Sequence, residues 1–226
     1  MSYFEHGQKT PWGYFVDAAT IPNFIDETKF NAFTNRKFVG DTRIAASIPG
    51  ATQAIRNYCG WHVSPNLSCG VFYNVHDLRD AFSGPDLLVQ LPATFVTGIF
   101  LIVLGAKWNE DQNAWEGDVI DGDDTDRYDL GPDGLLRVYD AAGLDRKARI
   151  FVHYYAGYDE AGIAPIEELA ANLVSHTITN PYGVNSESAG GVSVSYSSIG
   201  AAQTNAAILS EDSREVLQPY KTRGVY

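Results

Sequence analysis

The densest group of potential ligands in this 226-residue sequence is the acidic run DVIDGDDTDRYD at residues 118–129. Calcium binds oxygen ligands, and closely spaced carboxylates can supply them. An EF-hand loop starting at Asp121 would need glycine at its sixth position and glutamate at its twelfth, where this chain has Asp126 and Pro132. The pattern therefore favours a loop facing solvent or a channel over an ion site. The acidic residues assigned to that loop are Asp121, Asp123, Asp124 and Asp126.

Cys59, His62 and Cys69 form the second group whose residue types could bind a metal. A structural zinc site needs four ligands in close paired spacing, and these three match that pattern poorly. The other histidines stand alone, and no GxSxG, P-loop or GxGxxG motif occurs. We therefore expect no metal, no cofactor and no enzymatic activity. A triad assembled from distant residues would leave no such motif, so a hydrolase stays open as an alternative.

The overall charge argues against a conventional nucleic-acid-binding face. The chain carries 28 acidic and 16 basic residues, a net charge of −12, whereas such a face needs clustered lysine and arginine. An acidic wall would still let DNA slide through a channel, because it repels phosphates. Only 19% of residues are charged, while tyrosine, phenylalanine and tryptophan number 13, 11 and 4. This composition indicates either contacts with other copies or a β-rich domain with many strand aromatics.

Two cysteines are too few for a disulfide scaffold. No secretory signal is recognisable at the N-terminus, and the longest apolar run, residues 95–106, is too short to span a bilayer. We expect a chain made in the cytoplasm with reduced thiols and no membrane partner.

One helical stripe precedes the cysteine and histidine group. Its apolar members recur at spacings of four and three, and they are Ile44, Ile48, Ala51, Ile55 and Tyr58. Asp41 is a good start residue and Gly60 a good stop. Because Pro49 lies inside the stripe, we expect a kink there or a helix that begins near Ile48.

The hydrophobic period then changes to two, which predicts strands at 68–75, 86–91, 94–104, 134–139 and 149–155. Further helices are expected at 23–33 with Asp26 as its cap, after Pro165, and after Ser210. We predict an α+β fold: a small helical bundle with an inserted antiparallel β-domain and extended arms at both ends. Its parts are an N-terminal arm at 1–22, a helical part at 23–62 and 163–180, a β-domain at 63–162, an extended arm at 181–209, and a C-terminal helix and tail at 210–226.

Both arms carry an alternative. The N-terminal residues are too apolar for a free tail, so they need a partner surface or pair as a strand with the chain's own sheet. Residues 183–200 are rich in serine and glycine, as in a flexible linker, but Val192, Val194 and Tyr196 alternate. That alternation favours an arm that adds a strand to a neighbouring subunit.

A series of ordered motifs follows the helical stripe. They are YCGWH at 58–62, Leu91-Pro92, HYYAGYDE at 153–160, a proline-led helix, a serine-valine-serine-tyrosine segment ending at Tyr196, and a C-terminal helix ending near Leu217 and Tyr220. In this order they resemble the head-to-tail adaptor, or connector, proteins of long-tailed double-stranded DNA bacteriophages. The likeness covers roughly residues 23–226. The first twenty residues and the acidic run fall outside the family pattern.

The resemblance implies a ring, usually a dodecamer, docked under the portal protein in the neck of the virion. Such a ring extends the DNA channel, lets genomic DNA pass without sequence-specific binding, and provides a platform for stopper or tail-completion proteins. The C-terminal segment of such proteins contacts the portal, and the matching residues here are Tyr220, Lys221, Arg223 and Tyr226. The main alternative is a monomeric β-sandwich module that binds a ligand or carbohydrate through Trp108 or Trp115.

Overall fold

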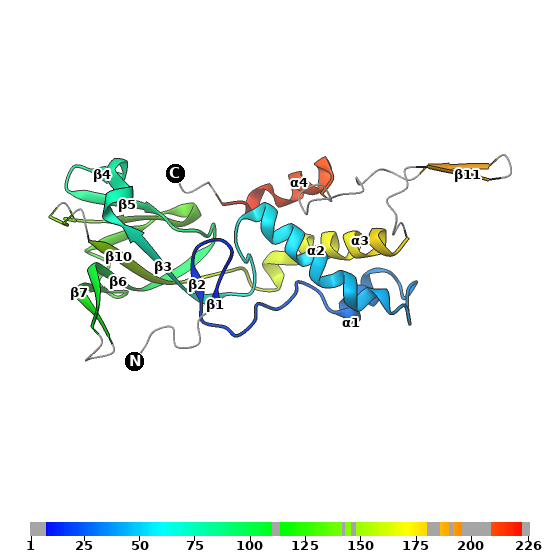
Figure 1. The fold of residues 1–226 in the computed structure, drawn as a ribbon, viewed down its shortest axis with the longest axis horizontal. Coiled ribbons are helices and arrows are strands. Elements are labelled where there is room, and N and C mark those ends of the chain that lie inside the picture. Colours follow the sequence, from blue (N-terminus) through cyan, green and yellow to red (C-terminus); the bar gives the residue numbers. More distant parts are fainter. Residues whose placement is uncertain are drawn as a thin grey trace. The chain divides into compact units, whose positions relative to one another are not determined.

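The fold, obtained as a computed structural model, is of the α+β class (Figure 1), as predicted. The structure describes residues 8–109, 114–141, 143–145, 148–179, 186–189, 192–195 and 209–222. For residues 79–81, 108, 109, 114, 115, 132, 186–189 and 192–195, it describes the backbone alone. The chain divides into two compact units. The β-unit comprises Met1–Ile21, Gly60–Asp159 and Thr222–Tyr226, and the helical unit comprises Pro22–Cys59 and Glu160–Lys221.

The β-unit contains two antiparallel sheets. The larger has the order β1-β2-β3-β10-β6-β7, formed by Gln8–Lys9, Phe15–Val16, Leu67–Asn74, Arg149–Ala156, Val96–Asn109 and Ala114–Asp121. The smaller has the order β4-β5-β9-β8, formed by Phe82–Ser83, Asp86–Gln90, Leu135–Val138 and Tyr128–Leu130. A short 3₁₀ segment, η1 at Val75–Ala81, leads from β3 of the larger sheet to β4 of the smaller one, and a second, η2 at Pro132–Gly134, joins β8 to β9 within the smaller sheet.

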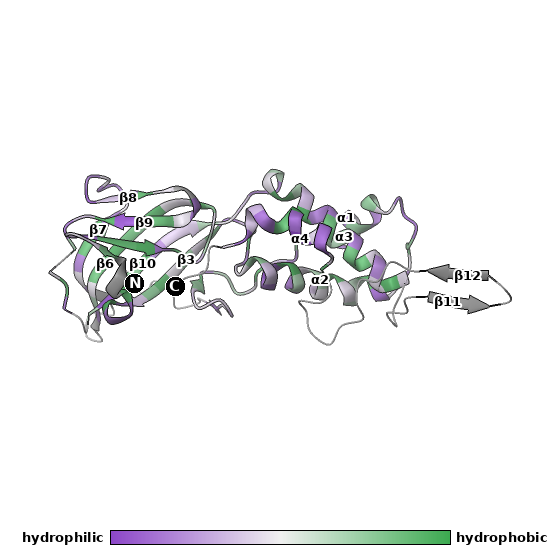
Figure 2. Ribbon diagram, turned by 90° about the horizontal axis from the view of Figure 1, so that it is seen from above, coloured by the Kyte–Doolittle hydropathy of each residue, from purple (hydrophilic) through white to green (hydrophobic). Residues whose placement is uncertain are grey.

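Strand β10 is the centre of the larger sheet, with β3 on one side and β6 on the other. Its alternating residues are buried on both faces, since Ile150, Val152 and Tyr154 as well as Phe151 are inaccessible to solvent. In Figure 2 the strands around β10 are largely coloured as hydrophobic. This confirms the strand predicted at residues 149–155, and the burial shows that both of its faces are covered.

The helical unit contains α1 at Glu27–Phe33, α2 at Arg43–Cys59, η3 at Ala161–Ile163, α3 at Ala164–Thr179, α4 at Glu211–Leu217 and η5 at Gln218–Tyr220. Helix α2 packs on α3 and α4. The caps were predicted correctly: Asp26 Oδ1 accepts from Lys29 N at 2.7 Å, and Ser210 Oγ accepts from Ser213 N at 3.2 Å.

The apolar stripe of α2 faces the core, with Ile44, Ile48 and Ile55 buried. Of the two alternatives for Pro49, the start near Ile48 is wrong, because the helix runs from Arg43 through Pro49; the kink stays a prediction. Pro49 and Gly50 are exposed, so water can bind the carbonyl that proline leaves without an intrahelical donor.

In α1, Phe30 is buried while Phe33 is 44% exposed. The strand predicted at 94–104 is longer, since β6 continues to Asn109, and β7 begins at Ala114. Of the two alternatives for the first segment, the structure has the strand that pairs with the chain's own sheet, because β1 and β2, within residues 8–16, lie at the edge of that sheet. They take that position because β2 pairs with β3 and buries Val16.

Candidate functional site

The structure does not assemble the proposed zinc ligands into a metal site. Among the described residues no group of three or more histidine, cysteine, aspartate or glutamate side chains is arranged to hold a metal ion. The thiols of Cys59 and Cys69 are buried, and burial raises the pKa of each to about 12. His62 is buried as well, and its ring is engaged by other groups.

His62 joins the first segment of the chain to the core of the β-unit. Its Nε2 lies 3.0 Å from the carbonyl oxygens of both Pro65 and Ala156, so this nitrogen carries the proton. Its Nδ1 then accepts from the Tyr14 hydroxyl at 2.7 Å, while its backbone N–H donates to the same hydroxyl at 2.9 Å. Tyr14 is fully buried, so this network holds the β1–β2 hairpin on the sheet.

Ser68 and His153 are a serine and histidine that the structure brings together, with 2.6 Å between Oγ and Nε2. The imidazole is buried, which lowers its pKa, and its centroid lies 4.7 Å from that of the Phe100 ring. This contact meets the first requirement of a hydrolase, a nucleophile beside a base. The second requirement is a pair of N–H donors that converge on the oxyanion of the substrate. Around Ser68 the backbone groups of β3 are directed into hydrogen-bond ladders with β10 and β2 and not towards such a point.

The acidic run forms the end of β7 and a turn that leads into β8. The turn is held by its own backbone, since Asp124 N donates to Asp121 O at 3.0 Å and Arg127 N donates to Asp124 O at 2.9 Å. The Tyr128 hydroxyl donates to Gly122 O at 2.6 Å. The carboxylates proposed to face solvent or a channel are exposed in this chain; they are Asp121, Asp123, Asp124 and Asp126.

The C-terminal segment packs on the helical unit as far as the structure describes it. Leu217 is fully buried, and the Tyr220 hydroxyl donates to Gly162 O at 3.0 Å. Lys221 is exposed, with its Nζ 5.0 Å from the ring centroid of Tyr58. The other two portal-contact candidates, Arg223 and Tyr226, lie outside the described residues.

The segment with alternating valines forms a β-hairpin. Strand β11, Ser186–Ala189, pairs with β12, Val192–Ser195, in antiparallel register from Ser186–Ser195 to Ala189–Val192. Val192 and Val194 lie in β12, and Tyr196 lies outside the described residues. Within the described chain this sheet has no third strand. An isolated two-stranded hairpin is at best marginally stable in water, so it gains stability from an added strand.

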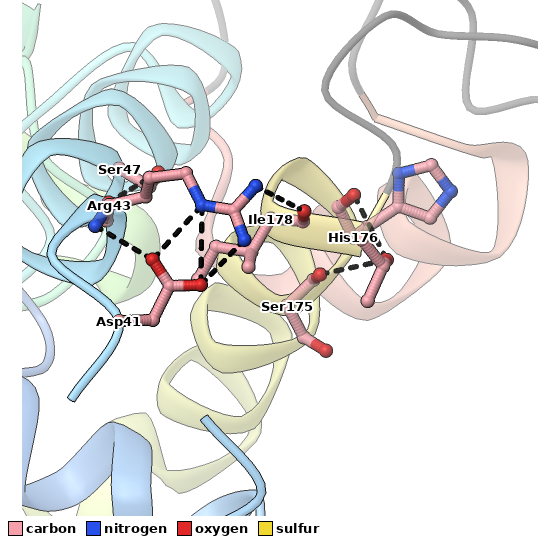
Figure 3. Close-up of polar contacts among 7 residues, drawn as sticks. Asp41, Arg43, Ser47, Ser175, His176 and Ile178 are labelled. Carbon is pink, nitrogen blue, oxygen red and sulfur yellow. Dashed lines mark hydrogen bonds and ion pairs between the residues drawn. The ribbon is translucent and has the colours of Figure 1, made fainter. Parts of the chain in front are cut away.

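The end of α3 that precedes this hairpin is fixed by an arginine. Arg43 lies between the Asp41 carboxylate and the last turn of α3 (Figure 3): its Nη2 is 2.6 Å from Asp41 Oδ2, and its Nη1 donates to Ile178 O at 3.1 Å. Hydrogen bonds from Arg43 lower the pKa of Asp41 to about 2. A cation suits the negative end of a helix, so the pair orders the point from which the chain leads to β11.

A pocket of about 300 Å³ in the β-unit was not anticipated from the sequence. It lies along the second half of β3, and its lining residues come from the turn after β1, from β3 and η1, and from the segment that follows β5; they are Trp12, Gly13, Val71, Phe72, Tyr73, Asn74, Asp77, Leu78 and Pro92. No spacing in the sequence connects these three segments, so no pattern could have indicated the pocket.

The tryptophans of the carbohydrate-binding alternative lie on opposite strands of the β6–β7 hairpin. The backbone register pairs Trp108 with Trp115, while their side chains are outside what the structure describes.

Comparisons with known proteins add no identification. No protein-family model matches the sequence, and no curated protein matches it significantly. In the described part of the chain, no helix is both long enough and apolar enough to cross a membrane.

Proposed function

We propose that this protein is a structural head-to-tail adaptor of a phage neck. In this role copies of the chain form a ring under the portal protein, extend the DNA channel and provide the docking platform for stopper or tail-completion proteins. The ordered motifs from Tyr58 to Tyr220 support this proposal at the level of sequence. At the level of structure, it is supported most by the β11–β12 hairpin, a two-stranded sheet with no third strand in the described chain.

The hairpin matters because a subunit of a ring needs a surface that is incomplete on its own. A strand added by a neighbour supplies main-chain hydrogen bonds, and alternate side chains supply specificity. A contact between two different surfaces of identical chains is head-to-tail, and it closes into a ring when the rotation per copy divides a full turn.

The charge distribution is compatible with a conduit for DNA. The net charge of −12 disfavours tight phosphate binding, and the exposed turn around Asp123 and Asp124 adds local negative charge. We propose that this turn faces solvent or the channel. The exposed ammonium of Lys221 is the described group best suited to a contact with the portal protein, since the Tyr220 hydroxyl is engaged by Gly162.

The proposal is tested by co-expressing the chain with the portal protein of the same genome. We expect a complex whose mass corresponds to a ring of adaptor chains on the portal, visible by electron microscopy at the portal's wider or narrower end. A chain that remains monomeric both alone and beside its portal would contradict the proposal. So would turnover of a substrate by the monomer.

Two variants examine the contacts separately. Replacing Val192, Val194 and Tyr196 by aspartate should prevent ring formation, whereas aspartates at Ser193 and Ser195, in the same strand with the opposite alternation, should be tolerated. Ring formation by the first variant would exclude these residues from the subunit interface.

The contact with the portal can be tested by removing residues 218–226, which should give a folded chain that no longer binds. This deletion also removes the hydrogen bond from Tyr220 to Gly162, so Lys221→Glu is the more selective change. Unchanged portal binding by both variants would exclude the C-terminal segment as the contact.

A further inference from the structure

We propose that the pocket of the β-unit binds an arginine side chain presented by a partner protein. The guanidinium pairs with the Asp77 carboxylate, while the aliphatic stem lies against the Trp12 indole. This inference goes beyond the proposed ring, because it assigns the β-unit a recognition site of its own. It can be tested on the chain alone, whether or not copies of the chain assemble.

A tight turn positions the aromatic wall of the pocket. Gly13 N donates to Thr10 O at 3.3 Å, and the Thr10 hydroxyl and backbone N–H both donate to Tyr14 O at 2.8 Å. The Trp12 ring stacks on the Tyr14 ring, with the two centroids 6.2 Å apart. Trp12 is nevertheless partly exposed, so its indole combines a fixed position with a surface that a ligand can reach.

The described lining of the pocket carries one formal charge, the Asp77 carboxylate. The other polar side chains of that lining already have partners within the chain: the Tyr73 hydroxyl donates to Gln90 O at 2.8 Å, and Asn74 Nδ2 donates to Asp77 Oδ2 at 2.8 Å. Hydrogen bonds from Asn74 and His76 lower the pKa of Asp77, so the carboxylate is ionised at neutral pH. A charged ligand group that suits this wall is therefore a cation.

The carboxylate can accept a two-point contact. Its Oδ2 accepts from Asn74, and its Oδ1 lies 3.3 Å from His76 Nδ1. A carboxylate offers about four lone-pair sites, so each oxygen keeps one for a further donor. The planar guanidinium of arginine donates to both oxygens and also stacks on aromatic rings, whereas the ammonium of lysine acts as a point charge. The combination of Asp77 and Trp12 thus favours arginine.

The size of the pocket suits a single side chain. Its volume is about 300 Å³, at the lower limit of small-molecule sites. Val71, Leu78 and Pro92 contribute apolar lining, on which the stem of an arginine can pack while its charged end stays near water. Because Asp77 is exposed, the charged wall can be reached by a side chain from another protein.

The chain's own Arg149 provides a test of the sign of the ligand charge. Its guanidinium lies 5.4 Å from the centroid of the Phe72 ring, and Arg149 is not among the lining residues. A cationic ligand would be weakly repelled by this group, whereas an anionic ligand would be attracted. Arg149→Gln should therefore leave arginine binding unchanged or tighten it by up to about twofold, and weaker binding would overturn the inference.

The experiment titrates the isotope-labelled chain with the peptide acetyl-Gly-Ser-Arg-Ser-Gly-amide and follows the indole N–H resonance of Trp12 by NMR. Loss of one indole resonance in Trp12→Phe assigns it. A second peptide with citrulline in place of arginine keeps the shape of the side chain and removes its charge. Asp77→Asn removes the charge of the pocket, and the matched control is Asp129→Asn, an exposed carboxylate of the same unit outside the lining.

We expect saturable shifts with the arginine peptide, and binding weaker by about fivefold or more for the citrulline peptide and for Asp77→Asn. Asp129→Asn should bind the arginine peptide as the unmodified chain does. Absence of shifts, equal binding of both peptides, or unchanged affinity in Asp77→Asn would overturn the inference and leave the proposed ring standing.

Two further outcomes identify other occupants. Shifts with free arginine amide but none with the peptide would indicate a small-molecule site and would overturn the assignment to a protein partner. Shifts of the Trp12 resonance that appear when the chain is concentrated without peptide, and that vanish in Asp77→Asn, would assign the pocket to a second copy. They would overturn the inference of a different partner protein as well.

Discussion

Replacing Tyr14 by phenylalanine should destabilise the β-unit far more than its position near the N-terminus suggests. The ring is fully buried and keeps its shape in the variant, so no cavity forms. What is lost is the hydroxyl that accepts from His62 N at 2.9 Å and donates to His62 Nδ1 at 2.7 Å. Leaving a buried polar group unsatisfied costs about 1–3 kcal/mol, so the two groups of His62 together predict a loss of about 2–6 kcal/mol.

The measurement is urea unfolding followed by tryptophan fluorescence, which reports the buried Trp61. The midpoint should fall while the slope stays unchanged, because the surface exposed on unfolding is the same. The control is Tyr58→Phe, whose hydroxyl is 3.5 Å from Arg214 O in an exposed contact and should cost less than about 0.5 kcal/mol. Equal midpoints for the two variants would refute the assignment of the first segment to the folded core.

Three further predictions concern other parts of the chain. Iodoacetamide at pH 8 should label neither Cys59 nor Cys69 in the folded protein, because burial raises the pKa of each thiol to about 12. In a urea titration followed by mass spectrometry, labelling of Cys59 then reports unfolding of the helical unit and labelling of Cys69 reports unfolding of the β-unit. Rapid labelling without urea would contradict this prediction. Burial lowers the pKa of His153 from 6.5, so as the pH drops below about 6.5 the unfolded chain binds a proton before the folded chain does, and the free energy of unfolding decreases. In His153→Gln this free energy should decrease less between pH 7.5 and 5.5 than in the unmodified chain. An unchanged pH dependence would exclude His153 as a source of the decrease. Asp86 is buried and accepts from Arg137 Nε at 2.9 Å. Asp86→Ala should therefore lower the free energy of unfolding, measured by thermal unfolding, by about 1–3 kcal/mol, and Asp86→Asn should lower it less. No change in either variant would show that the pair contributes nothing to stability.

The elements that could be predicted from the sequence are those specified by local patterns. The stripe from Ile44 to Ile55 defined the buried face of α2, and the alternation in residues 149–155 defined β10. The caps Asp26 and Ser210 were recognisable because capping needs only a side chain three residues before a backbone N–H. The sequence left two alternatives at Pro49, a kinked helix or a later start, because the cost of an interior proline depends on whether its turn is exposed, and tertiary packing decides that.

The features that escaped prediction depend on contacts between distant residues. Phe15 pairs with Gly70, and Tyr14 bonds His62, without any periodicity that connects the two segments. The pocket draws its walls from residues near 12, 71–78 and 92, so it exists only once the sheet has formed. The arm is proposed from the alternation at Val192 and Val194, but its hairpin form could not be predicted, because its first strand, Ser186–Ala189, carries no strong strand signal.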